Sequence, residues 1–422
     1  MNVRLLAPGL RGRRAALAAA TVLGLLLFQT GCGGEDPPAA GSPDAPAPQS
    51  LASAEQVTRG AYLAKVGNCA GCHTAPGGAP MAGGVRLETP YGAVYAGNLT
   101  PDPNTGLGSW SADEFHRAMH EGRGRDGRRL IPAFPYTSFT RVAREDNDAL
   151  FAYLRSLSPV VQAARPHELR FPYGTQAAMT VWQWLNFKPA RTAALAPVEG
   201  PARGEYLVRG LGHCGECHAP RNRWSAPAVD LTGGDMTGER WYAPSLHPAH
   251  DAGPVGAETV ALLRDGIGRS GAVAGPMARV VRDSTQHWRP SDLEQAARYL
   301  DSLPRAPTPA TPTPADPAQM KVGARIYADR CADCHGADGA GASGIYPALA
   351  GNPSVTQPSI RNLVQVLRLG AFAPSTIGNP RPYGMPPSEL SDGDVAAVLS
   401  HLRQSWGNQA AAVSVLDVMK AR

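Results

Sequence analysis

Three short strings of the sequence carry the residue types needed to hold an iron porphyrin. Each has two cysteines separated by two residues and followed directly by a histidine: Cys69-Ala70-Gly71-Cys72-His73, Cys214-Gly215-Glu216-Cys217-His218 and Cys331-Ala332-Asp333-Cys334-His335. This spacing is the attachment signature of a c-type haem, because two thiols on one turn can add across the vinyl groups while the histidine reaches the iron. We therefore predict three covalently bound haem c groups, with His73, His218 and His335 as proximal ligands.

Cysteine pairs of this spacing also occur in redox dithiols and in half of many zinc sites. Neither use requires a histidine beside the second cysteine. The chain also has no spaced pair of histidines that would complete a zinc site. The pattern therefore favours haem attachment over both alternatives.

A haem that transfers electrons needs a second axial ligand, and a methionine thioether opposite histidine raises its reduction potential. Met277 and Met385 each follow a motif in a stretch rich in glycine and proline, Ala274-Gly275-Pro276-Met277 and Tyr383-Gly384-Met385-Pro386-Pro387. We predict that these two methionines, on loops, are the distal ligands of the second and third haems.

The stretch that follows the first motif departs from this pattern. It reads Leu130-Ile131-Pro132-Ala133-Phe134-Pro135-Tyr136, and phenylalanine cannot ligate iron. The distal ligand of the first haem is therefore left open, either as a vacant position or as one of four other residues. These candidates are Met119, His120, His116 and Met81.

The second ring nitrogen of a proximal histidine usually donates to a backbone carbonyl, which fixes the tautomer. Pro244-Ser245-Leu246 and Pro347-Ala348-Leu349 are candidates to supply that carbonyl for His218 and His335. No corresponding stretch is assigned to His73.

The elements around the motifs are predicted to be mainly α-helical. A short helical pattern leads into each motif, at 59–63, 203–207 and 322–327, and an amphipathic helix closes each unit, at 146–157, 291–303 and 391–404. Ser291 with Glu294 indicates a capping box, and Ser391 with Asp394 a related cap.

The ends and joins of the chain have their own composition. Arg4, Arg11, Arg13 and Arg14 precede an apolar run too short to span a bilayer, which predicts a signal peptide over 1–31. Cys32 follows directly, so lipid attachment there is expected, with an ordinary cleaved signal as the alternative. Residues 32–53 form a flexible tether to a membrane surface, 304–317 a proline-rich linker and 409–422 a C-terminal tail.

The charge balance changes once the signal is removed. The chain has 40 basic and 35 acidic residues, and four of the basic ones lie before Cys32, which leaves 36 against 35. With no basic stripe, nucleic acid is not an expected partner, and a balanced surface favours protein partners. No P-loop or nucleophile elbow is present, so no substrate-oxidising site is visible in this chain.

Further stretches of the sequence resemble one family, the three-haem cytochrome c subunits of membrane-bound bacterial dehydrogenases. The resemblance covers nearly all of the chain after the signal. It rests on Ala96-Gly97-Asn98-Leu99-Thr100-Pro101-Asp102, Gly106-Leu107-Gly108-Ser109-Trp110, Gly212-His213 with the motif that follows, Trp241-Tyr242-Ala243-Pro244-Ser245-Leu246, Tyr346-Pro347-Ala348-Leu349-Ala350-Gly351-Asn352 and Ser405-Trp406-Gly407-Asn408.

The resemblance implies three tandem class I cytochrome c domains, at 54–190, 200–303 and 318–408. It also implies a role on the periplasmic side of the cell membrane, carrying electrons from a dehydrogenase catalytic subunit to ubiquinone or a terminal oxidase. That catalytic subunit would be a quinoprotein, a flavoprotein or a molybdoprotein. Family members carry methionine where this chain has Phe134, a departure shared with relatives that resemble partners of molybdenum enzymes.

Two alternatives are carried forward from the sequence. One is a haem enzyme or ligand-binding protein that uses an open first haem. The other is a soluble electron shuttle without the lipid anchor.

Overall fold

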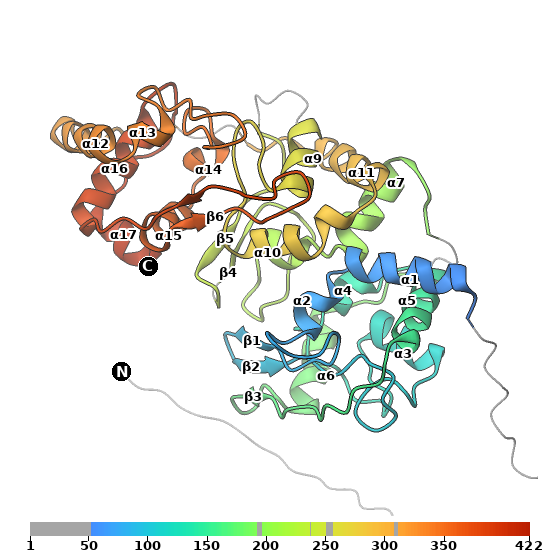
Figure 1. Cartoon of the computed structure of the whole chain (residues 1–422). Coiled ribbons are helices and arrows are strands. Elements are labelled where there is room, and N and C mark those ends of the chain that lie inside the picture. The colour runs from blue at the N-terminus through green and yellow to red at the C-terminus, as the bar shows by residue number, and fades with distance from the viewer. Residues whose placement is uncertain (1–51, 192–195, 237, 250–255, 308–310) are drawn as a thin grey trace, which may run out of the picture. The chain divides into compact units, whose positions relative to one another are not determined.

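The computed structural model describes residues 52–191, 196–236, 238–249, 256–307 and 311–422 (Figure 1). The predicted signal peptide, Cys32 and nearly all of the predicted tether lie outside these residues. We call 52–191, 196–307 and 311–422 the first, second and third segments, each of which holds one Cys-x-x-Cys-His motif.

The prediction of a mainly helical fold is confirmed. The helices of the first segment are α1 (Ala54–Val66), α2 (Cys69–His73), α3 (Ala112–Glu121), α4 (Tyr136–Phe139), α5 (Arg144–Ser156) and α6 (Gln176–Asn186). Those of the second are α7 (Gly200–Glu205), the π-helical turn η1 (Tyr206–Leu211), α8 (Gly215–His218), α9 (Gly256–Asp265), α10 (Gly275–Asp283), the short turn η2 (Thr285–His287) and α11 (Pro290–Asp301). The third has α12 (Pro317–Arg330), α13 (Ala332–His335), α14 (Pro353–Thr356), α15 (Arg361–Leu369), α16 (Asp392–Gln404) and α17 (Val415–Ala421).

Short antiparallel strands accompany the helices and were not predicted. β1 (Arg86–Thr89), β2 (Gly92–Tyr95) and β3 (Glu168–Leu169) form one sheet in that order. β4 (Gly234–Met236) pairs with β5 (Trp241–Ala243), and β6 (Ala371–Phe372) pairs with β7 (Gly384–Met385). With two to four residues each, these strands are too short to leave a readable alternation of apolar and polar residues.

In every segment the helix before the motif packs on the closing helix: α1 on α5, α7 on α11 and α12 on α16. A glycine lies at each crossing, because an added Cβ would come within 1.9 Å of Ala149 O at Gly60, 2.1 Å of Gln295 O at Gly204 and 2.2 Å of Ala397 O at Gly323. Only glycine allows so close an approach of two backbones. The motif that follows is therefore held at a fixed place relative to the closing helix.

The predicted closing helices are confirmed within two residues at each end, as α5, α11 and α16. The predicted cap at Ser391 is also confirmed, since its hydroxyl accepts from the backbone N–H of Asp394 at 3.2 Å. The predicted capping box at Ser291 is wrong, because the helix begins at Pro290 and Ser291 lies within its first turn. Proline suits that first position because its φ is already helical and its missing N–H is not needed there.

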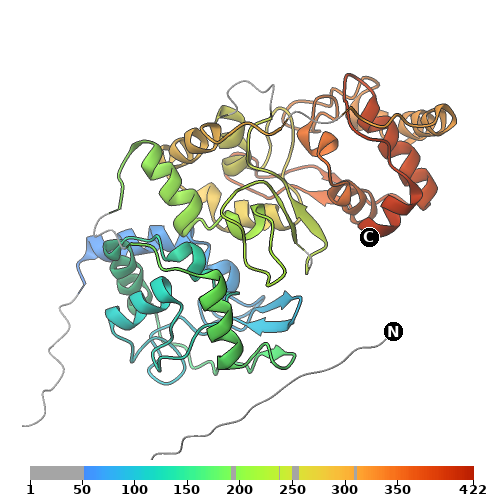
Figure 2. The same ribbon diagram turned by 180° about the vertical axis from the view of Figure 1, so that it is seen from behind.

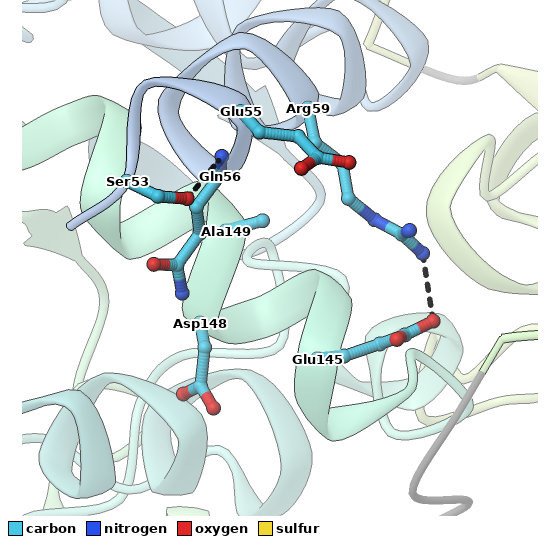
Figure 3. Close-up of a pocket in the computed structure, with 7 residues that line it drawn as sticks. All are labelled: Ser53, Glu55, Gln56, Arg59, Glu145, Asp148 and Ala149. Carbon is cyan, nitrogen blue, oxygen red and sulfur yellow. Dashed lines mark hydrogen bonds and ion pairs between the residues drawn. The ribbon is translucent and has the colours of Figure 1, made fainter.

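The first and second segments are joined by two tyrosine hydroxyls, each of which donates to the carboxylate of an Arg–Asp ion pair in the other segment. Arg59 Nε donates to Asp146 Oδ1 at 2.6 Å, and the Tyr206 hydroxyl of the second segment donates to Oδ2 of the same carboxylate at 2.6 Å. Arg59 also reaches Glu145 across the α1–α5 contact (Figure 3).

The second pair repeats this arrangement with the segments exchanged. Arg203 Nε and Nη2 both donate to Asp292 at 2.8 Å, and the Tyr62 hydroxyl of the first segment donates to Asp292 at 2.5 Å. Each Arg–Asp pair is thus completed by a tyrosine from the other segment. The sequence pattern Arg-Gly-x-Tyr-Leu, at 59–63 and 203–207, supplies the arginine of one pair and the tyrosine that completes the other.

The third segment lacks these partners. Val322 and Arg325 stand where the arginine and the tyrosine would be, counted from Gly323. Asp394 corresponds to Asp146 and Asp292, since each lies three residues before the carbonyl that faces the glycine. Its carboxylate accepts from the Ser391 hydroxyl at 2.7 Å. The third segment instead forms a separate hydrophobic cluster, which includes Val398 and Leu399, whereas one cluster runs through the first and second.

The fold, which Figure 2 shows from the other side, has two further helices that differ in burial. The stretch predicted as a tail contains α17, whose Val418 and Ala421 are buried in the hydrophobic cluster of the third segment. In contrast, α6 leaves Trp184 80% and Val181 54% exposed, an apolar surface on the first segment. Among the described residues, no helix has the length and apolar character needed to cross a membrane.

We predict that Asp292→Asn destabilises the protein by about 3 kcal/mol, because it leaves the buried Arg203 guanidinium without its counter-charge. Asp394→Asn, at the corresponding position of the third segment, is the matched control and should cost less than about 1 kcal/mol. Thermal or denaturant unfolding of the haem-loaded protein measures both. Equal losses for the two variants would contradict the role given to the Arg203–Asp292 pair.

The effect of Asp292→Asn on stability should depend on pH. Burial opposes ionisation of Asp292, but hydrogen bonds from Arg203 and Tyr62 outweigh it and leave the pKa lowered. A carboxylate with a lowered pKa in the folded state stabilises that state at neutral pH and loses this contribution as the pH falls through that pKa. The difference in unfolding free energy between wild type and Asp292→Asn should therefore shrink in acid.

Candidate haem sites

Each Cys-x-x-Cys-His motif lies at a short helical turn that follows the helix crossing the closing helix, with η1 between the two in the second segment. In the first segment α2 holds Cys69, Cys72 and His73; in the others α8 and α13 end at His218 and His335. This turn places the two cysteines and the histidine of each motif close together, as haem attachment requires. The side chains of all three histidines are half-buried.

The three histidines share one hydrogen-bonding arrangement. Nδ1 lies 2.7 Å from Gly97 O in His73, 2.7 Å from Pro244 O in His218 and 3.0 Å from Pro347 O in His335. Since a carbonyl only accepts, Nδ1 must carry the proton and donate it. Nε2 of each ring is then the unprotonated nitrogen, with its lone pair available to a metal.

These contacts confirm the two stretches predicted to supply the accepting carbonyl and add the one that was missed. Gly97 is followed two residues later by Leu99, just as Pro244 is followed by Leu246 and Pro347 by Leu349. All three leucines pack against the hydrophobic clusters. A leucine two residues after the carbonyl was thus a signal in the sequence that could have identified Gly97.

The backbone around each histidine is fixed in the same way. Glycines with positive φ donate from their N–H groups to the histidine carbonyls, Gly83 to His73 at 2.8 Å, Gly233 to His218 at 2.8 Å and Gly341 to His335 at 2.9 Å. The loop after every motif therefore binds the histidine at two places, its backbone carbonyl and its ring Nδ1.

The electrostatic surroundings favour neutral ligands. Desolvation by the surrounding protein lowers the pKa of His73, His218 and His335, although the carbonyl hydrogen bond opposes it, so each imidazole is neutral at pH 7. Burial raises the pKa of the Cys69 and Cys214 thiols to about 12. Redox-active dithiols have lowered pKa values, so these surroundings are unlike those of a catalytic dithiol.

The two predicted distal methionines lie beyond the motifs, but not on loops. Met277 is in the first turn of α10, where Pro276 starts the helix, and Met385 is in β7 opposite Ala371. The prediction of loop positions is wrong for both, because the proline allows a helix to begin at Gly275 and β7 has only two residues. Both side chains are half-buried, and Met385 packs against the hydrophobic cluster of the third segment.

The four candidates for the first haem lie in two places. Met81 is in the loop after His73, where its N–H donates to the Thr74 hydroxyl at 3.0 Å. His116, Met119 and His120 are on α3, with Met119 buried in the first hydrophobic cluster. Phe134 packs against the same cluster and against the Phe139 ring.

The first and second motifs lie near each other in the described chain. α10 of the second segment packs against α2, which holds the first motif. Glu216, inside the second motif, accepts from the Thr137 hydroxyl of the first segment at 2.7 Å. The two attachment sites are therefore part of one packed structure.

The comparisons with known proteins give the same interpretation. The cytochrome c family model matches residues 57–158 and 320–406. The cytochrome c subunit of the quinone-type alcohol dehydrogenase of Gluconobacter oxydans (strain 621H) is 36% identical over 393 residues, covering 87% of this chain and 82% of that protein. This chain belongs to the family of dehydrogenase cytochrome c subunits. Its cofactor is thus covalently bound haem c.

Two further relatives come from other dehydrogenases. The gluconate 2-dehydrogenase cytochrome c subunit of Pantoea cypripedii is 35% identical and covers 87% of this chain and 89% of that protein. A subunit of the nicotinate dehydrogenase of Pseudomonas putida is 37% identical over 84% of this chain but only 30% of that longer protein. The relatives of this chain are thus named for dehydrogenases of more than one kind.

Haem c fits the residues present, with two cysteines to attach it and a neutral imidazole to ligate its iron in each segment. When bound, the group supplies one-electron redox chemistry. The protein supplies the histidine with its fixed tautomer, and Met277 and Met385 are the predicted opposite ligands.

We predict that Met277→Ala or Met385→Ala lowers the reduction potential of one haem by on the order of 0.1 V, within the about 0.8 V that axial ligation spans. Met320→Ala, a half-buried methionine on α12, is the control and should leave all potentials unchanged. Spectroelectrochemical titration of each variant measures the effect. Unaltered potentials in both the Met277 and the Met385 variant would show that the distal ligands lie elsewhere.

Proposed function

We propose that this chain is a three-haem electron-transfer subunit that carries electrons from a partner dehydrogenase to ubiquinone or a terminal oxidase. The observation that carries this proposal is the threefold repetition of one histidine environment, with Nδ1 bound to a backbone carbonyl and the histidine carbonyl bound to a glycine N–H. Three class I cytochrome c domains, at 54–190, 200–303 and 318–408, would each hold one haem c.

Contacts between the segments support transfer along the chain. Glu216 and Thr137 connect the first two segments near their motifs. The Asn362 side chain on α15 both accepts from the Tyr242 N–H at 2.8 Å and donates to its carbonyl at 2.7 Å. Tyr242 lies two residues before Pro244, whose carbonyl binds His218. The second segment is thus in direct contact with the first and the third, as an intermediate carrier must be.

The electron source is proposed from the relatives. Their names assign them to alcohol, gluconate and nicotinate dehydrogenases. We therefore propose a dehydrogenase catalytic subunit as partner, either a quinoprotein, a flavoprotein or a molybdoprotein. Substrate oxidation would belong to that subunit, and this chain would supply the path for its electrons. The exposed Trp184 and Val181 on α6 offer apolar surface for such a partner.

We propose that the protein is held on the periplasmic side of the cell membrane by a lipid on Cys32. This rests on the sequence alone, namely the apolar run, the cysteine that follows it and the Pro-rich stretch to residue 53. Cys32→Ser should move the protein from the membrane fraction to the soluble periplasmic fraction while its haem content stays unchanged. Wild-type protein that is released without detergent would instead support the soluble shuttle.

The test of the three-haem relay combines cofactor stoichiometry with electron transfer. We expect the matured chain to retain three haems after acid–acetone extraction and all three to be reduced when its dehydrogenase turns over. Cys217→Ala with Cys214→Ala removes one attachment and should leave two haems per chain. A wild-type count below three, or haems that no dehydrogenase reduces, would refute the proposal.

A further inference from the structure

The helices before the stretches that contain Phe134, Met277 and Met385 end in the same way. α3, α9 and α15 are each followed by a glycine with positive φ, namely Gly122 at 63°, Gly266 at 75° and Gly370 at 77°. Each glycine donates to the carbonyl four residues before it, on Ala118, Leu262 and Val366. The three helix ends can therefore be superimposed residue by residue, counted back from the glycine.

Three residues before the glycine, the segments differ in one way. The residue is Met119 in the first segment, Leu263 in the second and Leu367 in the third. In the following stretch the order is reversed, with Phe134 in the first segment and Met277 and Met385 in the others. Each segment thus has one thioether and one hydrocarbon side chain at these two positions, and the first segment has them exchanged.

The third segment shows that the two positions are neighbours. The N–H of Ser388, three residues after Met385, donates to the Leu367 carbonyl at 2.7 Å. A Cβ at Gly370 would lie 2.5 Å from the Met385 carbonyl. Leu367 and Met385 also belong to the same hydrophobic cluster. Leu367 on α15 and Met385 on β7 are therefore neighbours in that segment.

In the first segment, the stretch that contains Phe134 also returns to the end of α3. The N–H of Leu130 donates to the Gly122 carbonyl at 2.8 Å, and a Cβ at Gly122 would lie 2.6 Å from the Tyr136 ring. Met119 is 5% exposed and lies in the cluster against which Phe134 packs. The thioether of Met119 is thus buried in the same hydrophobic cluster that Phe134 packs against.

The other candidates are held by different contacts. The backbone of Met81 is bound on both sides to the loop around the proximal histidine, through Thr74, which follows His73, and through Leu99, whose N–H donates to the Met81 carbonyl at 2.8 Å. Met81 is therefore fixed to the loop that holds His73. The His120 ring donates from Nδ1 to the Thr140 carbonyl at 2.9 Å and is stacked on His116, whose Nδ1 lies 3.0 Å from Asn147 Nδ2. These contacts direct both rings toward the elements that follow α3.

We propose that Met119 is the distal ligand of the first haem and that Phe134 fills the hydrophobic position taken by leucine in the other segments. The proposal rests on the three-haem function proposed above. A thioether sulfur is neutral and polarisable, and it would give the first haem the same His–Met ligation as the other two. The first haem is then a closed electron-transfer site, with no position open to substrate.

The test begins with Met119→Leu, which copies the second and third segments and changes the core volume little. Wild-type ferrous protein should bind no carbon monoxide, and the variant should bind it at one of its haems. The charge-transfer absorption of methionine-ligated ferric haem should fall by about a third, since one of three such haems is lost. Met81→Leu is the matched control and should behave like wild type.

The double variant Met119→Leu with Phe134→Met returns a thioether to the loop position. It should again exclude carbon monoxide and recover the lost absorption. The proposal is overturned if Met119→Leu keeps all haems closed, if wild type already binds carbon monoxide at the first haem, or if the double variant stays open. Haem count and reduction by the dehydrogenase are measured in parallel, so that failure of the relay itself is recognised separately.

Discussion

The rest of the structure depends on the close crossing of two helices in each segment. At Gly60, Gly204 and Gly323 the backbone of one helix rests against a carbonyl of the closing helix, and no side chain larger than hydrogen fits between them. Because each motif begins within ten residues of this contact, the crossing determines where the cysteines and the histidine lie. The loop after the motif then needs only a glycine N–H and a carbonyl to fix the histidine ring.

The segments use the same crossing but join their neighbours differently. The first two share Arg–Asp pairs completed by each other's tyrosines, and one hydrophobic cluster runs through both. The third has valine and arginine at the corresponding positions, a cluster of its own and contacts through Asn362 to the backbone of Tyr242. Carboxylates buried in this way restrict geometry strongly, because a charge in the interior cannot be left without its partner.

Much of this structure could be predicted from sequence where the signal is local. The motif spacing, the closing helices and two of the three carbonyl stretches follow from short patterns, and the structure agrees. The pairing of Tyr62 with Asp292 could not be predicted, because the two residues are 230 positions apart and no local sequence pattern indicates that they are in contact. The strands β4 to β7 and the helical position of Met277 were also missed. There a few backbone hydrogen bonds, set by tertiary contacts, decide the local conformation.

The exchanged positions of Met119 and Phe134 show a further limit. A single stretch of sequence suggests only that a ligand is missing, whereas comparison of the three helix ends supports Met119 as the proposed replacement. Repetition within one chain therefore carries information that a motif alone does not.

The contacts near the first two motifs, α10 on α2 and Thr137 with Glu216, have a consequence for the energetics of the cofactors that these motifs hold. Two redox centres in one packed, weakly polarisable interior repel each other's added charge, so that an electron on one makes the next harder to accept on the other. The midpoints seen in a titration would then belong to the pair of centres and not to either one, as with coupled acid–base groups. The first two segments would then share the charge that they hold.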